Sequence, residues 1–113
     1  MHNDIFQEAS EFVNSCRDEI IKDMKKLISV NSVRSESTPC APFGEGPRLA
    51  LLTVTDTCRS RGLETKDFTV CTEAEVKGRD SRTIGIITHT DVVPAGDGWD
   101  SDPFTLTKRD GWL

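Results

Sequence analysis

The sequence lacks both a long apolar run and a dense basic patch. Its 113 residues hold 14 Lys and Arg against 19 Asp and Glu, for a net charge of -5 and an isoelectric point near 5.0. This balance argues against a surface that binds nucleic acid or an anionic membrane. No stretch reaches the length of a membrane span, and the polar N-terminus does not look like a secretion signal. We therefore expect a cytoplasmic location, with the basic residues at 22–26 on a solvated helix face.

The sequence also lacks closely spaced cysteine pairs. Cys16, Cys40, Cys58 and Cys71 lie far apart, without the Cys-x-x-Cys spacing of thiolate zinc sites and redox motifs. Because an export signal is absent too, a disulfide framework is disfavoured and four free thiols are expected. Neither internal repeats nor low-complexity tracts are present. A single domain over residues 1–113 is the simplest organisation.

Two helices are indicated in the first half of the chain. From about Asp4 to Ile28, apolar residues recur at spacings of three and four, which predicts one long amphipathic helix that packs on a sheet. A second helix is expected from Arg48 to Arg61, with Pro47 in its first turn and Gly62 just past its end. The apolar face of the first helix comprises Ile5, Ala9, Phe12, Cys16, Ile20, Met24 and Leu27.

The connection between these helices, residues 29–46, is rich in Ser, Pro and Gly and predicts a long loop. Long loops inside a compact domain are often functional. Two interpretations remain open, a border of the substrate site and a plain connector.

The second half of the chain is predicted to form strands. Residues 63–70 mix apolar and charged side chains and predict a strand that leads from the helix, and residues 74–77 are typical of a short edge strand. Residues 83–88 form an apolar, β-branched run without polar alternation, which is typical of a central strand covered on both faces. Residues 105–108 alternate like another strand, before a turn at 110–111. The order of elements predicts an α/β fold with two helices packed on a partial mixed β-sheet.

His89 and Asp91 follow the expected central strand directly. Extended backbone places these two side chains on the same face, where they can hydrogen-bond each other as a simple surface pair. The alternative is a metal site, because neutral imidazole binds zinc and a carboxylate partner fixes its tautomer. The chemistry would then be metal-assisted hydrolysis.

The residues around this pair carry a family resemblance. The sequence His-Thr-Asp-Val-Val-Pro at 89–94, Gly-Asp-Gly-Trp at 96–99 and Asp-Pro-Phe at 102–104 resembles the first metal-binding segment of the dinuclear zinc peptidases and deacylases. Carnosinases, aminoacylases, succinyl-diaminopimelate desuccinylases and peptidase V-like dipeptidases belong to that family. Residues 42–48 resemble the loop that opens the second helix of the peptidase V-like dipeptidases.

The resemblance implies a zinc-exopeptidase-like catalytic domain, of which residues 1–113 would be the N-terminal portion. His89 matches a ligand of one of two zinc ions, and Asp91 matches the carboxylate that supports that ligand in catalysis. The implied substrate is a dipeptide or an N-acyl amino acid, and cobalt or manganese could replace zinc. Thr88 and Thr90 depart mildly from the family pattern. The family's later ligands, its glutamate base and its lid domain have no counterpart, so a fragment that is inactive alone is expected.

Two rival interpretations stay open. A deacylase or desuccinylase would use the same chemistry on acylated amino acids. A noncatalytic remnant would fold in part and self-associate through uncovered sheet edges. Asp100 and Asp102 are interpreted as turn residues rather than ligands, with Trp99 and Phe104 holding their loop against the sheet.

Overall fold

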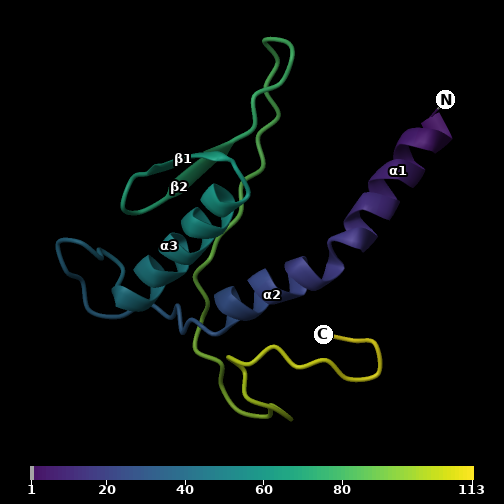
Figure 1. The fold of residues 1–113 in the computed structure, drawn as a ribbon. Helices are drawn as coiled ribbons and strands as arrows, with labels where there is room; N and C mark the ends of the chain where they lie inside the picture. The colour runs from purple at the N-terminus through teal and green to yellow at the C-terminus, as the bar shows by residue number, and fades with distance from the viewer. Residues whose placement is uncertain (1) are drawn as a thin grey trace.

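The computed structural model describes residues 2–113, and their side chains from residue 4 onward. Three helices are followed by a two-stranded antiparallel sheet, which confirms the predicted α/β class (Figure 1). The elements are α1 (His2–Ser15), α2 (Arg17–Ile28), α3 (Glu45–Ser60), β1 (Glu64–Asp67) and β2 (Thr72–Glu75).

The single long N-terminal helix that the periodicity predicts is broken at Cys16. This residue has φ -92° and ψ 3°, and the hydroxyl of Ser15 donates to the carbonyl of Phe12 at 2.7 Å. Such a local side-chain bond competes with regular helix geometry. The expectation that the whole apolar face packs on a sheet is wrong, because Phe12 is 69% exposed and α1 projects away from the sheet (Figure 1).

The second predicted helix forms as α3, and the residues that flank it explain where it begins and ends. Gly44 precedes α3 with φ 106° and ψ 162°, a region open essentially to glycine, and Pro47 lies in the first turn. At the other end Gly62 has φ 82°, and the amide of Leu63 donates to the carbonyl of Cys58 at 3.1 Å. This closes the helix in the way that a left-handed glycine allows.

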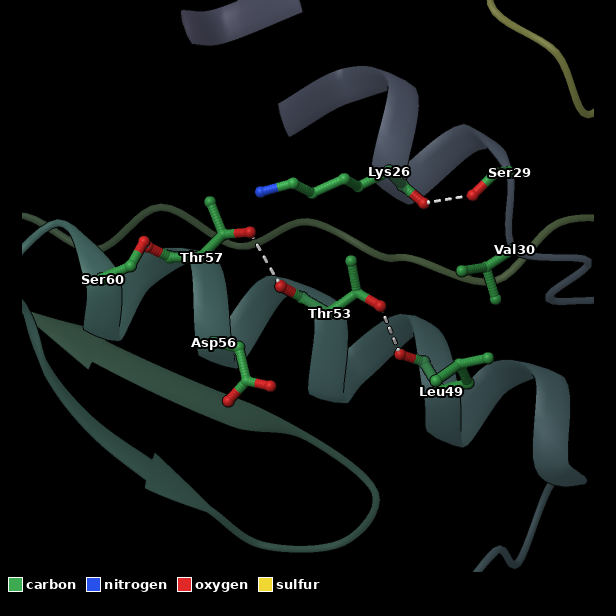
Figure 2. A pocket seen from close by; sticks show the side chains of 8 residues that line it. All are labelled: Lys26, Ser29, Val30, Leu49, Thr53, Asp56, Thr57 and Ser60. Atoms are coloured by element: carbon green, nitrogen blue, oxygen red, sulfur yellow. Dashed lines mark hydrogen bonds between the residues drawn. The ribbon is translucent and has the colours of Figure 1, made fainter. Parts of the chain in front are cut away.

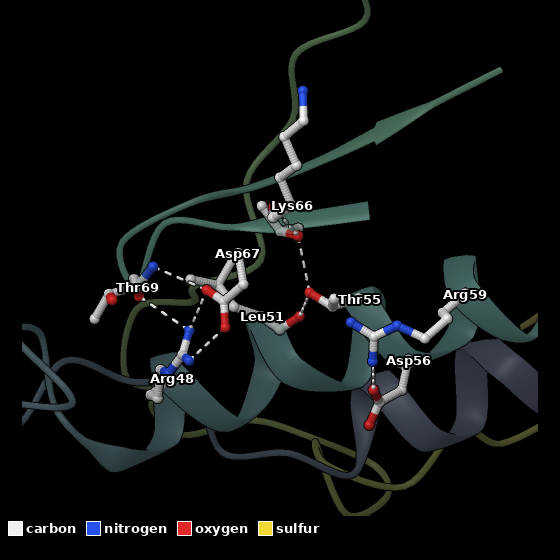
Figure 3. Close-up of polar contacts among 9 residues, drawn as sticks. Arg48, Leu51, Thr55, Asp56, Arg59, Lys66, Asp67 and Thr69 are labelled. Atoms are coloured by element: carbon white, nitrogen blue, oxygen red, sulfur yellow. Dashed lines mark hydrogen bonds and ion pairs between the residues drawn. The ribbon is translucent and has the colours of Figure 1, made fainter. Parts of the chain in front are cut away.

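The β1–β2 hairpin covers one side of α3. Thr55, 2% exposed, lies with its Oγ1 2.7 Å from the Leu51 carbonyl and 2.9 Å from Thr72 Oγ1. A bidentate ion pair adds to this contact, since the Arg48 guanidinium donates to both carboxylate oxygens of Asp67 at 2.7 and 2.6 Å (Figure 3). Arg48 holds the pKa of Asp67 at about 2, below its ordinary 3.8, with help from the amide of Thr69.

Charged side chains also join α2 to α3. Arg61 Nη2 lies 2.9 Å from Glu19 and 2.6 Å from Asp23, and these hydrogen bonds raise the pKa of Arg61 and lower that of Asp23. All three side chains are partly exposed, so solvent screens the pairs. They orient the helices more than they stabilise the fold.

The predicted central strand at residues 83–88 does not form. Ile84, Ile86 and Ile87 are 90–99% exposed, and within residues 2–113 no backbone hydrogen bond joins this segment to another. The sheet is therefore antiparallel rather than mixed, and parallel pairing in the described part of the chain is limited to one bridge between Val33 and Val92. A strand needs a neighbouring strand for its amides and carbonyls, and its own composition cannot supply one.

The remaining C-terminal prediction is borne out in part. Asp110 and Gly111 have φ of 51° and 83°, as the centre of a type I′ turn requires, and they join Arg109 to Trp112. The strand expected at 105–108 is absent from the described chain.

The molecule is open rather than compact. Its radius of gyration is 17.0 Å, where a compact domain of this length has about 13 Å. Its accessible surface is 9566 Å², where a folded monomer of this mass exposes roughly 6,200 Å². Many large apolar side chains are therefore exposed to solvent. Within residues 2–113, none of the helices has the length and apolar character that a membrane crossing requires.

Candidate functional site

The segment that carries His89 and Asp91 is held by the loop between α2 and α3. Ser32, 2% exposed, donates its hydroxyl to the carbonyl of Thr90 at 2.8 Å, and the amide of Val92 lies 3.4 Å from the carbonyl of Ser32. The start of α3 packs on the same loop, because a Cβ on Gly46 would lie 2.0 Å from the Asn31 carbonyl. This loop therefore anchors the site segment, a role that the sequence left undecided between a substrate border and a connector.

His89 and Asp91 lie together, as alternation along extended backbone predicts. His89 Nδ1 is 3.3 Å from Asp91 Oδ1 and 3.0 Å from the Asp91 carbonyl oxygen. With Nδ1–H donating to these oxygens, the lone pair of a neutral ring lies on Nε2. The His89 side chain is 83% exposed. An imidazole oriented by a carboxylate, with its other nitrogen accessible, suits a metal ligand.

A complete metal site is not assembled within residues 2–113. In that range no three or more His, Cys, Asp and Glu side chains gather closely enough to hold an ion. A zinc site normally takes three or four protein ligands. The residues present thus fit one ligand and its supporting carboxylate, and no more. The four cysteines are free thiols, as predicted, and Cys40 and Cys71 are exposed.

The loop after the pair is shaped by its own side chains. Trp99 Nε1 donates to the Ala95 carbonyl at 2.9 Å. Asp102 accepts the Phe104 amide at 2.8 Å and lies 3.2 Å from the Thr105 hydroxyl. Asp102 is therefore a turn residue, as predicted, because a carboxylate just before proline commonly caps the following backbone.

A hollow of about 310 Å³ lies beside the pair. Leu27 and Ile28 at the end of α2 and Val30 just after it line the hollow on one side, and Trp99 and Phe104 line it from the loop. The aromatic residues therefore lie near the end of α2, so the expectation that they hold the loop against the sheet is wrong.

A second hollow, of about 540 Å³, lies between α2 and α3 (Figure 2). Lys26 and Asp56 are its charged residues. The hydroxyls of Thr53 and Thr57 donate to carbonyls of α3 at 2.8 Å. Such hydroxyls satisfy their own helix, so this larger hollow offers little catalytic chemistry.

The chain is similar to several known proteins that carry the name of a dipeptidase. No family model matches the chain. It is 41% identical over 102 residues to a Staphylococcus haemolyticus (strain JCSC1435) protein named "Putative dipeptidase", a match covering 88% of this chain and 22% of that protein. Proteins of the same name in Staphylococcus aureus strains USA300 and N315 are 41% identical over 96 residues, covering 83% of this chain and 20% of theirs. The chain spans about a fifth of the length of the curated relatives it matches.

Proposed function

We propose that the protein containing this chain is a zinc-dependent dipeptidase. The observation that carries the proposal is the similarity to proteins named as dipeptidases, at 41% identity over 88% of the chain. A continuous match of that extent includes residues 89–94. The residue pair in that segment has the arrangement of a ligand and its supporting carboxylate, with His89 Nδ1 3.3 Å from Asp91 Oδ1.

The roles of the two residues follow from their contacts. Asp91 holds the proton of His89 on Nδ1, and this keeps the Nε2 lone pair available for a metal ion. Ser32 fixes the backbone between them through the Thr90 carbonyl. A bound zinc ion would supply a water of lowered pKa and polarise the peptide carbonyl. Cobalt or manganese would fit the same donors, and the other ligands must come from elsewhere.

Metal binding by the intact protein tests the proposal. We expect calorimetry to detect two zinc equivalents in the native protein, with His89→Ala weakening one site at least tenfold and Asp91→Asn weakening it roughly 10- to 100-fold. His2→Ala is the matched control, and it should leave affinity unchanged. Undiminished binding in His89→Ala would overturn the assignment of the ligand.

Substrate preference is tested separately with a panel of dipeptides and N-acyl amino acids. A dipeptidase should hydrolyse the dipeptides faster, and His89→Ala should abolish hydrolysis. Faster hydrolysis of the acylated amino acids would instead establish a deacylase. A protein that binds no metal through His89 and hydrolyses neither class would be a noncatalytic remnant.

A further inference from the structure

Ser32 makes hydrogen bonds to the backbone on both sides of Asp91. Its hydroxyl donates to the carbonyl of Thr90 at 2.8 Å, and its own carbonyl accepts the amide of Val92 at 3.4 Å. The Thr90 carbonyl belongs to the peptide group before Asp91, and the Val92 amide belongs to the peptide group after it. Because peptide groups are planar, holding both of them restrains both backbone torsions of Asp91.

The backbone conformation of Asp91 in turn controls the contacts of His89. Nδ1 of His89 lies 3.0 Å from the Asp91 carbonyl oxygen and 3.3 Å from Asp91 Oδ1. The carbonyl oxygen lies in the peptide plane that Ser32 holds through Val92, and the carboxylate extends from the adjoining Cα. The side chains of His89 and Asp91 are 83% and 68% exposed, so packing does little to hold them. Their arrangement therefore depends on the backbone beneath them.

The backbone that carries Ser32 is itself held in place. Ser32 is 2% exposed, and the amide of Val33 donates to Asn31 Oδ1 at 3.3 Å. A Cβ on Gly46 would lie 2.0 Å from the Asn31 carbonyl oxygen and 3.4 Å from Ser32 Cα. The start of α3 thus packs directly against residues 31–32, and this contact gives the hydrogen bonds of Ser32 a firm base.

Other hydroxyls in and beside the helices bond differently. Those of Ser29, Thr53 and Ser60 donate at 2.8 Å to carbonyls three or four residues earlier in the chain. Such local bonds are common for Ser and Thr. The partner of the Ser32 hydroxyl lies 58 residues away in the sequence. This bond therefore joins two distant segments, one of which carries the candidate site.

We infer that Ser32 is a positioning residue of the candidate metal site, because it places Asp91 where Asp91 keeps the proton of His89 on Nδ1. The inference rests on the proposed function and deepens it, since a metal ion on Nε2 requires that tautomer. Ser32 acts through the backbone of residues 90–92 and not as a ligand.

Nitrogen NMR of the neutral His89 ring tests the positioning in the full 113-residue chain without added metal. We expect the Nδ1–H tautomer to predominate in the native chain and Ser32→Ala to lose this preference. Ser29→Ala is the matched control, because it removes a hydroxyl bond of the same length that ends within α2. It should keep the native tautomer. His2→Ala identifies the signals of the other histidine, and circular dichroism checks that the helices are retained.

Ser32→Cys separates hydrogen bonding from packing at this buried position. A thiol fills the space of the hydroxyl but donates only weakly. The preference for the Nδ1–H tautomer should therefore be weaker than in the native chain and stronger than in Ser32→Ala. A fully native tautomer in Ser32→Cys would show that filling the space is sufficient, which would overturn the inference.

Zinc binding by the intact protein, measured by calorimetry, is the second test. Ser32→Ala should weaken the site that contains His89 roughly tenfold, as the loss of a group that orients a ligand does. Ser29→Ala should leave the affinity unchanged. A native protein that binds no zinc would refute the proposed function, while the NMR result still decides the role of Ser32. A folded Ser32→Ala variant that keeps the native tautomer, or the native zinc affinity, would overturn this inference alone.

Discussion

The helices and hairpin between residues 17 and 75 differ sharply from the extended chain at 83–104. In the first region Arg48, Thr55 and Arg61 each join two elements through side-chain hydrogen bonds. In the second region the contacts are mostly local, apart from those made to Ser32. A helix satisfies its backbone internally, whereas a strand depends on a neighbour. The candidate site thus lies on the part of the chain that depends most on other segments.

Hydrogen exchange should show the largest difference between the two regions. In dilute, monomeric protein we expect amides of residues 84–88 to exchange near the rate of unfolded chain. Amides in the middle of α3 should exchange at least roughly 100-fold more slowly, because they are hydrogen-bonded within a packed helix. Mass spectrometry of proteolytic fragments measures both. Equal protection of the two regions would contradict the contrast.

Gly44→Ala should cause the largest loss of stability among the substitutions considered. Its backbone lies in a region nearly closed to other residues, and a Cβ there would lie 2.8 Å from the Ser35 amide nitrogen. We expect a loss of about 2 kcal/mol in the free energy of unfolding, measured with urea. Gly62→Ala is the control, with positive φ but open space, and should cost about 1 kcal/mol. Equal costs would show that the Ser35 contact is unimportant.

Thr55→Val should have a smaller effect. It removes the hydroxyl that lies 2.9 Å from Thr72 across the contact between α3 and the hairpin. The shape of the side chain is nearly kept, so the expected loss is about 1 kcal/mol in thermal or urea unfolding. Thr53→Val removes a bond within α3 alone, at 2.8 Å. A loss as large in this control would mean that the helix bond, and not the contact with the hairpin, is responsible.

Asp67→Asn should produce the smallest change, and one that depends on pH. The folded pKa of Asp67 is about 2, below its ordinary 3.8, so the ion pair stabilises the fold above pH 3.8 and is lost as the pH falls toward 2. The midpoint of unfolding should therefore be lower in the variant at neutral pH and equal to that of the native chain near pH 2. Asp56→Asn, which removes a more exposed pair with Arg59, should change the midpoint less.

Local signals in the sequence predicted much of the first region. Pro47 and Gly62 place α3 within a few residues, and Asp110-Gly111 predicts its turn. Alternation along extended backbone likewise predicted that His89 and Asp91 lie together. The strand predicted at residues 83–88 does not form, since a β-branched composition favours a strand without providing its neighbour.

The sequence by itself determined α3, the turn at 110–111 and the pairing of His89 with Asp91, because each depends on residues only a few positions apart. Only the tertiary structure decided that Ser32 anchors the site segment, that Arg48 joins α3 to the hairpin and that residues 83–88 stay uncovered. These features join residues far apart in the chain or depend on a missing neighbour. Local periodicity carries no record of such contacts, and the packing of whole elements selects them.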